Sequence, residues 1–330
     1  MHSTREPDFD TLQLYAGHEL GRSLNARAVP IYASTSFCFD STMHQLITAC
    51  LSVYSRISNS TVGGMSAQFV ALLTLTSAGD NIVSTSFLYG GKFGIQVRFV
   101  VDNTLGMGGY LFRPIDYGAV QSATKWIGGH GTTIAGILVN SGHFDWKAAS
   151  DRFPSFNTPS EGFQNVIYAD LGDSKAFLLK LMLREVGPAL NPFAAFLLLQ
   201  GVETLSLRAE RHCENAMRLA KFLDAHPKVS WVSYLGLNSH PSHLRAKSLF
   251  PLGGVKASKI FINNLRLASH LANIEDAKTL VIQPAATTHI QSSDEEQLST
   301  GVTRDLIRVS VGTGAVSDII TDFEGALSVL

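Results

Sequence analysis

Charged residues are scarce in this chain of 330 residues: they make up 16% of it, and the formal net charge is −1. Lysines and arginines are scattered along the sequence, so neither nucleic acid nor an anionic membrane surface is an expected partner. Hydrophobic residues make up 45% of the chain, which also has 28 glycines. This composition is typical of a large globular protein and excludes an intrinsically disordered chain.

Cysteine is also rare, with three copies, Cys38, Cys50 and Cys213, and no CxxC spacing. An odd number without that spacing argues against both a disulfide framework and a structural zinc site. The longest apolar run, Phe193–Leu199, is too short to span a bilayer, and the N-terminus lacks the apolar segment of a secretory signal. We therefore expect a soluble cytoplasmic protein with reduced thiols.

Strand and helix patterns alternate along the first half of the chain, as an α/β fold requires. A helical pattern over Ala67–Leu75 follows a glycine pair, and strand patterns follow at Asn81–Ser84 and Val97–Val101. Helix predominates from about Phe193, and Glu203–Ala225 carries one apolar helical face. The remaining elements that we expect are strands at Val229–Tyr234, Thr279–Gln283 and Leu306–Val311, and a helix at Ser317–Leu327.

The stretch Gln121–Thr132 holds the first candidate functional group, Lys125, between the hydroxyl residues Ser122 and Thr124 and ahead of a glycine-rich tail. A lysine reacts with an aldehyde once burial and neighbouring groups lower its pKa. Flanking hydroxyls can donate to a phosphate, and glycines let the backbone approach a ligand closely. The ordinary alternative is a solvated surface lysine.

Two more segments suit an anionic ligand. Gly64 and Met65 open a helical pattern, where outward-pointing N–H groups form an anion site. Tyr54 and Arg56 combine a phenol with a bidentate guanidinium, a pair that suits phosphate, although a packed tyrosine and a surface arginine are the simpler alternative.

Two charged residues stand in or after strand patterns. Asp102 follows a buried-strand run, where α/β sheets place groups that contact ligands, although a turn cap is an equal alternative. Arg308 lies between strand hydrophobes, so it faces solvent or is held inward by an anion such as a substrate carboxylate.

Together these motifs resemble the pyridoxal-phosphate enzymes of cysteine and methionine metabolism, most of all the O-acetylhomoserine sulfhydrylases (homocysteine synthases). The resemblance covers nearly the whole chain. The segments that carry it include Phe9–Leu12, Arg27–Tyr32, Tyr54–Arg56, Val101–Thr104, Ser122–Gly131, Arg152–Pro154, Leu198–Leu205, Arg211–Asn215, Ser269–Asn273, Asp276–Lys278, Thr287–His289 and Ile307–Gly312.

The resemblance implies roles around the cofactor, pyridoxal 5′-phosphate. Lys125 is similar to the Schiff-base lysine, which is both covalent anchor and general base. Asp102 is similar to the carboxylate that faces the pyridine nitrogen, and Tyr89 to the tyrosine that stacks on the ring. Tyr54 and Arg56 match residues that reach the phosphate of the neighbouring subunit's cofactor, which implies a homodimer or homotetramer.

The same resemblance implies a phosphate cup and a substrate clamp. Gly64 and Met65, through backbone N–H groups, and Ser122 and Thr124 match the cup, while Arg308 matches the arginine that binds the α-carboxylate of the amino-acid substrate. The implied reaction is γ-replacement: sulfide displaces acetate from O-acetylhomoserine to give homocysteine, a transferase step of methionine biosynthesis. Cystathionine γ-synthase or γ-lyase activity, or a specialised pathway with another nucleophile, is the alternative within the family.

The implied fold is α/β of fold type I, like that of aspartate aminotransferase, with a mostly parallel sheet flanked by helices and a smaller C-terminal α+β domain. We expect an N-terminal arm at residues 1–50 that is extended over residues 1–36, a shortened cofactor-binding large domain at 51–195 and the small domain at 196–330.

Compared with the family, the chain lacks segments between Val62 and Gly63, between Gly91 and Val101, before Gln121 and after Gly254, so we expect an incomplete sheet. The alternative function is therefore a catalytically impaired chain that partners a full-length homologue.

Overall fold

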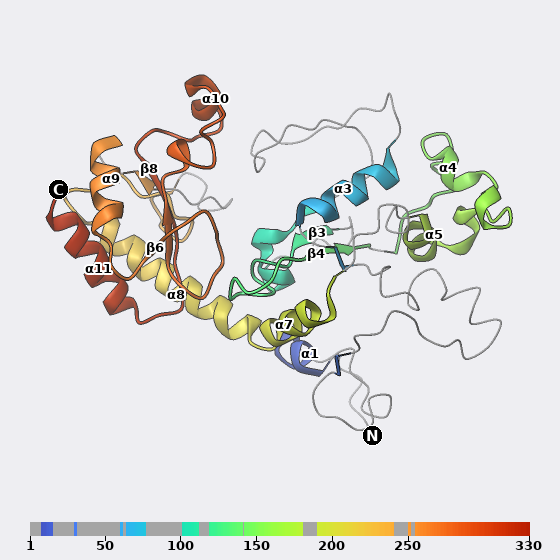
Figure 1. The fold of residues 1–330 in the computed structure, drawn as a ribbon, viewed down its shortest axis with the longest axis horizontal. Coiled ribbons are helices and arrows are strands. Elements are labelled where there is room, and N and C mark those ends of the chain that lie inside the picture. The colour runs from blue at the N-terminus through green and yellow to red at the C-terminus, as the bar shows by residue number, and fades with distance from the viewer. Residues whose placement is uncertain are drawn as a thin grey trace. The chain divides into compact units, whose positions relative to one another are not determined.

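The structure is a computed structural model, and its elements are drawn in Figure 1. It describes residues 8–15, 30–31, 60–61, 64–76, 101–111, 119–140, 142–180, 190–240, 250–251 and 255–330. The described residues divide into two compact units: those up to Leu205 form the first, and those from Ser206 onward form the second. In the part of the chain that the structure describes, no helix is both long and apolar enough to cross a membrane.

The first unit is built on a four-stranded sheet. Its strands are β1 (Ser60–Thr61), β4 (Gly136–Val139), β3 (Ala119–Ser122) and β2 (Val101–Asp102), in that spatial order. Strand β2 runs parallel to β3, and β4 runs antiparallel to both β3 and β1. Since we expected a mostly parallel sheet, the described part of this sheet is more mixed than the sequence suggested.

Helix α3 (Gly64–Leu75) packs on this sheet and confirms the helix expected at Ala67–Leu75. Its buried face contributes Ala67 and Ala71, one turn apart, to a cluster with Val120 of β3. Because alanines present little bulk, the helix axis lies close to the strands. The closeness brings the first residues of α3 to the end of β3.

Helix α7 (Pro192–Val202) supports the chain that follows β3. Pro192 stands at its first position, and the side chain of Asn191 caps it by accepting a hydrogen bond from the N–H of Phe193 at 2.8 Å. Leu198 packs with Ala123 and Ile127 in a small buried cluster. Gly201 is essential to this contact, since an added Cβ would lie 2.5 Å from the carbonyl oxygen of Gly128.

An aromatic cluster forms the other core of the first unit. It lies among α4 (Pro154–Asn157), the 3₁₀ helices Glu161–Phe163 and Tyr168–Leu171, and α5 (Asp173–Lys180). Trp146 stacks on Phe156 with ring centroids 3.9 Å apart, and its indole N–H donates to the carboxylate of Asp173 at 2.7 Å. The polar edge of the buried indole is thereby satisfied.

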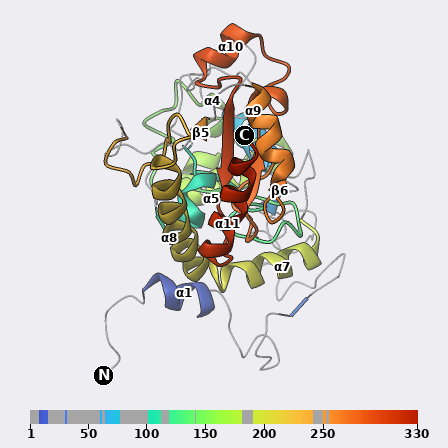
Figure 2. The same ribbon diagram turned by 90° about the vertical axis from the view of Figure 1, so that its left-hand side faces the viewer.

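The second unit has its own four-stranded sheet, in the order β5 (Phe250–Pro251), β8 (Leu306–Ser310), β7 (Leu280–Ile282) and β6 (Ser269–His270). Helices α8 (Leu205–Asp224), α9 (Val255–Asn264) and α11 (Val316–Ser328) pack around it (Figure 2). Their buried side chains join those of the strands in one core, for example Leu219, Phe261, Val281, Ile307 and Phe323. A short helix, α10 (Asp294–Ser299), follows the 3₁₀ turn Pro284–Ala286.

Several elements expected in the second half of the chain are confirmed, namely α7, α8, β7, β8 and α11. The strand expected at Val229–Tyr234 is wrong: these residues are irregular apart from one bridge at Ser233. Val229 and Val232 pack against the core, while the backbone makes turn bonds such as Val229 N–H to the carbonyl of His226 at 3.1 Å. The β-branched composition therefore reflects loop packing rather than pairing.

The expected extended arm is also corrected in one segment, because Phe9–Tyr15 forms helix α1. Phe9 contacts Tyr110 edge to face, with ring centroids 5.3 Å apart, so the helix is packed rather than extended. The strand expected at Asn81–Ser84 and most of that at Val97–Val101 lie outside the described residues.

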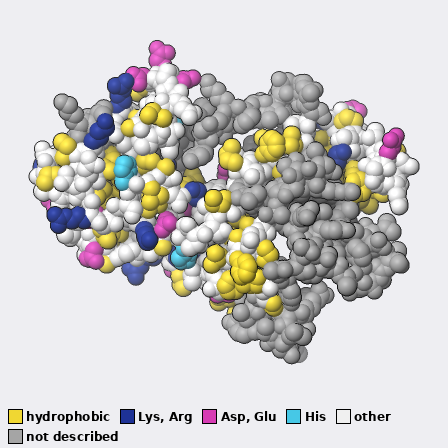
Figure 3. Space-filling view, viewed as in Figure 1, with side chains coloured by type: hydrophobic (Ala, Val, Ile, Leu, Met, Phe, Trp, Pro, Cys, Tyr) yellow, Lys and Arg dark blue, Asp and Glu magenta, His cyan; other side chains and the backbone are white. Residues whose placement is uncertain are grey.

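On the face shown in Figure 3, basic and acidic side chains are interspersed over the described surface.

Candidate active site

The segment with Lys125 is a compact turn directly after β3. The N–H of Lys125 donates to the carbonyl of Ser122 at 3.1 Å, and the N–H of Gly129 donates to the carbonyl of Lys125 at 2.6 Å. Gly129 has a φ of 68° and Gly131 one of 64°, conformations that glycine adopts without steric cost. The half-buried Lys125 thus lies in a hydrogen-bonded turn at the carboxyl end of β3.

Thr124 anchors this turn to the residue that precedes β4. Its hydroxyl accepts a hydrogen bond from the N–H of Ala135 at 2.9 Å and donates to the carbonyl of Ala135 at 3.2 Å. The N–H of Thr124 donates to the same carbonyl at 3.2 Å. Thr124 therefore has a structural role whether or not it also contacts a ligand.

The N-terminus of α3 meets the end of β3 at this point. A Cβ added to Gly64 would lie 2.7 Å from the Cβ of Ser122, so only glycine allows this approach. Met65 is the next helical residue, and its side chain is exposed. The first N–H groups of a helix have no intrahelical partner, so this junction offers an anion several donors. Gly64, Met65 and Ser122 are thus brought together, and their role as a phosphate cup stays a prediction.

Asp102 lies at the end of β2, beside β3. Because β2 and β3 are parallel, Asp102 and Ser122 lie at the same edge of the sheet. One oxygen of Asp102, Oδ1, accepts from the N–H of Thr104 at 2.9 Å, and the other, Oδ2, accepts from Nε2 of Gln68 at 2.6 Å. Thr104 also accepts from the N–H of Ser122 at 2.8 Å, through its hydroxyl oxygen.

Sequence reasoning missed Gln68 and Thr104. Each had a weak signal: Gln68 stands one helical turn after Gly64, and Thr104 stands two residues after Asp102, at the spacing of an Asx turn. These patterns are common in proteins, and only the tertiary structure shows that both residues bind one carboxylate.

Arg308 belongs to the second unit, on β8 opposite Ile282 of β7. Its Nη2 donates to the carbonyl of Asn273 at 3.0 Å, and the guanidinium is half-buried. Burial and then the positive charge of Arg308 lower the pKa of His289 below its ordinary value. The hydroxyl of Thr288 is 3.0 Å from Nδ1 of His289.

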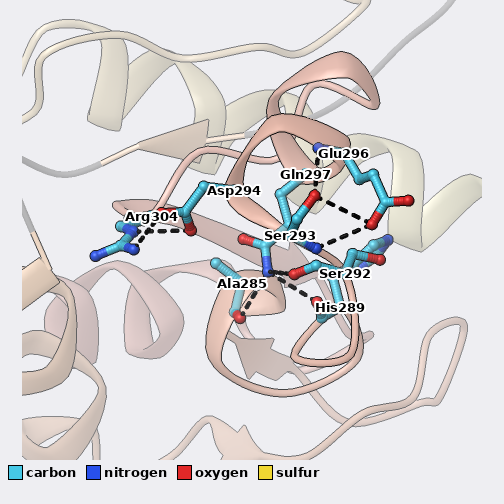
Figure 4. Close-up of polar contacts among 8 residues, drawn as sticks. All are labelled: Ala285, His289, Ser292, Ser293, Asp294, Glu296, Gln297 and Arg304. Carbon is cyan, nitrogen blue, oxygen red and sulfur yellow. Dashed lines mark hydrogen bonds and ion pairs between the residues drawn. The ribbon is translucent and has the colours of Figure 1, made fainter.

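The loop that carries His289 is held by a buried glutamine. Nε2 of Gln297 lies 2.8 Å from the carbonyl oxygen of His289, 3.2 Å from that of Ser292 and 3.4 Å from that of Ala285 (Figure 4). Gln297 is oriented by α10, whose first turn is closed by a capping box between Ser293 and Glu296.

The predicted residues Tyr54, Arg56 and Tyr89 lie outside the described residues. Within the described ranges, no group of three or more His, Cys, Asp or Glu side chains is arranged to hold a metal ion.

Comparison with known proteins shows the family to which the chain belongs. Residues 92–328 match the family model described as Cys/Met metabolism PLP-dependent enzyme. The chain belongs to this family. It is therefore a pyridoxal-phosphate-dependent enzyme of a family that acts on small molecules, as the sequence predicted.

Relatives within the family share much of the sequence. Homocysteine synthase of Schizosaccharomyces pombe is 44% identical, over 97% of this chain and 98% of its own length. O-acetyl-L-homoserine sulfhydrylase 1 of Thermus thermophilus is 39% identical, over 97% of this chain and all of its own length. The first alignment runs over 421 positions and thus exceeds the 330 residues here by 91, so at least that many positions are gaps in this chain. This difference supports the expectation of missing internal segments and leaves their positions as predictions.

A solved structure of the same family confirms the fold class. The putative O-acetylhomoserine (thiol)-lyase of Campylobacter jejuni superposes with a TM-score of 0.86 and 25% identity, and the match covers 97% of this chain and 100% of that one. That structure contains a lysine modified by pyridoxyl phosphate.

Proposed function

We propose that this protein is an O-acetylhomoserine sulfhydrylase, which replaces the acetate group of O-acetylhomoserine with sulfide to give homocysteine in the cytoplasm. One observation carries the proposal: Asp102, Ser122, Lys125 and the N-terminus of α3 converge at one edge of the sheet in the first unit. The names of the relatives from Schizosaccharomyces pombe and Thermus thermophilus support the choice of substrate.

The residues at this edge fit pyridoxal phosphate. Because Gly64 has no side chain, α3 begins directly beside Ser122, and the first N–H groups of the helix, those of Gly64 and Met65, are available to the phosphate. Thr124 can turn its hydroxyl hydrogen from the carbonyl of Ala135 to the phosphate while it still accepts from the N–H of Ala135. Asp102 suits the protonated ring nitrogen. When bound, the cofactor supplies an electron sink for negative charge at the substrate's Cα.

Lys125 has two tasks in this proposal. Its amine would hold the cofactor covalently, and once released it would remove the proton from Cα of the substrate as general base. The backbone hydrogen bonds of the turn from Ser122 to Gly129 hold the Cα of Lys125 in place while its side chain moves. From the resemblance, Arg308 is assigned the substrate's α-carboxylate, which a guanidinium binds through paired hydrogen bonds.

The roles of Tyr89, Tyr54 and Arg56 in this proposal come from the resemblance alone. Tyr89 stacks on the pyridine ring. Tyr54 and Arg56 reach the phosphate of the neighbouring subunit's cofactor, and Tyr54 also contacts substrate, so we propose a homodimer or homotetramer.

Absorbance spectroscopy and a product assay test the function. Purified protein is expected to bind pyridoxal phosphate with a visible absorbance band, and Lys125→Ala is expected to abolish the band. Lys147→Ala is the matched control, because Lys147 is exposed and paired with Asp170. With O-acetylhomoserine and sulfide, mass spectrometry is expected to detect homocysteine, and cysteine in place of sulfide is expected to be a poor nucleophile.

Three results would contradict this function. A band that survives Lys125→Ala would remove the proposed anchor. Efficient formation of cystathionine from cysteine would indicate a cystathionine γ-synthase instead. Turnover only in the presence of a full-length relative would support the alternative function, a catalytically impaired chain that partners a full-length homologue.

A further inference from the structure

We propose that Gln68 is a positioning residue that holds the carboxylate of Asp102 in the orientation required by the cofactor's ring nitrogen. The inference rests on the proposed function, because it assigns Asp102 to that nitrogen. It concerns a residue of α3 whose hydrogen bond to Asp102 joins the helix to the end of β2.

The two oxygens of Asp102 are bound from two directions. Oδ2 accepts from the side chain of Gln68 at 2.6 Å, and Oδ1 accepts from the backbone of Thr104 at 2.9 Å. The terminal torsion of an aspartate is broad, and Asp102 is exposed, so the carboxylate of an unbound side chain would rotate readily. Rotation here breaks at least one of the two bonds. The pair of donors therefore fixes the plane of the carboxylate.

The chemistry of glutamine suits this task. An ionised carboxylate only accepts hydrogen bonds, so the amide of Gln68 must present its nitrogen, and such a bond to a charged group is short and strong. The amide is neutral and leaves the negative charge of Asp102 available to a cationic ring nitrogen. A lysine at position 68 would compete with the ring nitrogen for the carboxylate of Asp102. A glutamate at position 68 would repel that carboxylate.

Helix α3 connects the two ends of the proposed cofactor site. Gly64, in its first turn, contacts Ser122 at the phosphate end, and Gln68 lies four residues, or about 6 Å, further along the axis. Thr104 provides a second connection between Asp102 and Ser122. Its N–H donates to the carboxylate of Asp102, and its hydroxyl oxygen accepts from the N–H of Ser122. The position of Asp102 is therefore coupled to the phosphate cup through two separate links.

The test measures binding of two probes to the full chain: pyridoxal phosphate, and its 1-deaza analogue, in which a CH group replaces the ring nitrogen. Wild-type protein is expected to bind pyridoxal phosphate more tightly than the analogue. Gln68→Ala is expected to weaken binding of pyridoxal phosphate about tenfold, with little change for the analogue. Gln68→Glu is expected to weaken it further. Leu73→Ala, at an exposed position of the same helix, is the control and is expected to change neither.

The outcomes separate the inference from the function on which it rests. If Gln68→Ala loses affinity for both probes equally, or for neither, the role of Gln68 is overturned. The proposed function still stands in that case, provided that the wild-type protein binds pyridoxal phosphate. Wild-type protein that binds both probes equally also overturns the inference, because Asp102 then does not contact the ring nitrogen. Wild-type protein that binds neither probe overturns both. Melting temperatures equal to that of Leu73→Ala confirm that the variants are folded.

Discussion

Gly64 and Ser122 approach so closely that a single methyl group on Gly64 would lie 2.7 Å from the Cβ of Ser122. Contacts of this length are repulsive, and both residues belong to packed backbone elements, so neither yields easily. The junction of α3 and β3 therefore depends on a residue without a side chain.

Substitution of this glycine is expected to be costly. Gly64→Ala should lower the free energy of unfolding by about 1–3 kcal/mol through overpacking and should weaken binding of pyridoxal phosphate. Gly325→Ala is the matched control: position 325 lies in α11 with no atom within 4 Å of the added Cβ. That substitution should stabilise the protein by about 0.4–1 kcal/mol. Thermal unfolding of both variants checks the prediction, and equal melting temperatures would contradict it.

The hydroxyl of Thr124 should matter more than its methyl group. Thr124→Ser keeps both hydrogen bonds to Ala135 and is expected to retain most of the cofactor affinity. Thr124→Val leaves the N–H of Ala135 without this acceptor and should lower the free energy of unfolding by about 1–3 kcal/mol. Urea denaturation and cofactor titration of this pair of variants measure both effects. Similar losses in the two variants would show that shape, not hydrogen bonding, governs the position.

Protonation of His289 should destabilise the second unit. Burial and then the charge of Arg308 lower the pKa of His289 below 6.5, so the unfolded chain binds this proton first as pH falls. The stability contributed by neutral His289 is present above about pH 6.5 and is lost as pH falls through the folded-state pKa. His289→Gln should flatten the pH dependence of unfolding in this range, as measured by urea denaturation at a series of pH values, and an unchanged pH dependence would contradict this role.

A second measurement checks the cause of that shift. Arg308→Met removes the positive charge and should raise the pKa of His289, as observed by NMR titration of the imidazole. An unchanged pKa would mean that burial alone sets it.

The hydrogen bonds of Gln297 should stabilise the loop that carries His289. Gln297→Ala leaves the carbonyl oxygens of Ala285, His289 and Ser292 without the amide donor. The substitution should lower the free energy of unfolding by about 2 kcal/mol. Hydrogen exchange of residues 284–292 should accelerate. Gln291→Ala, at an exposed position of the same loop, is the control and should leave exchange unchanged. Equal protection in the two variants would contradict this role.

Sequence patterns located features that are local in the chain. Periodicity placed α8 and β8. Gln68 could not be found in this way, because its importance comes from Asp102, which is 34 residues away. Composition failed at Val229–Tyr234, where apolar side chains serve a loop that packs on the core rather than a strand.

Gly201 has a consequence for the genetics of the protein. A side chain there would collide with the carbonyl oxygens of Ile127 and Gly128, which belong to the backbone after Lys125. No exchange of side chains at positions 127 or 128 moves those oxygens away. A suppressor screen that starts from Gly201→Ala should therefore recover reversions to glycine rather than compensating changes at its two neighbours.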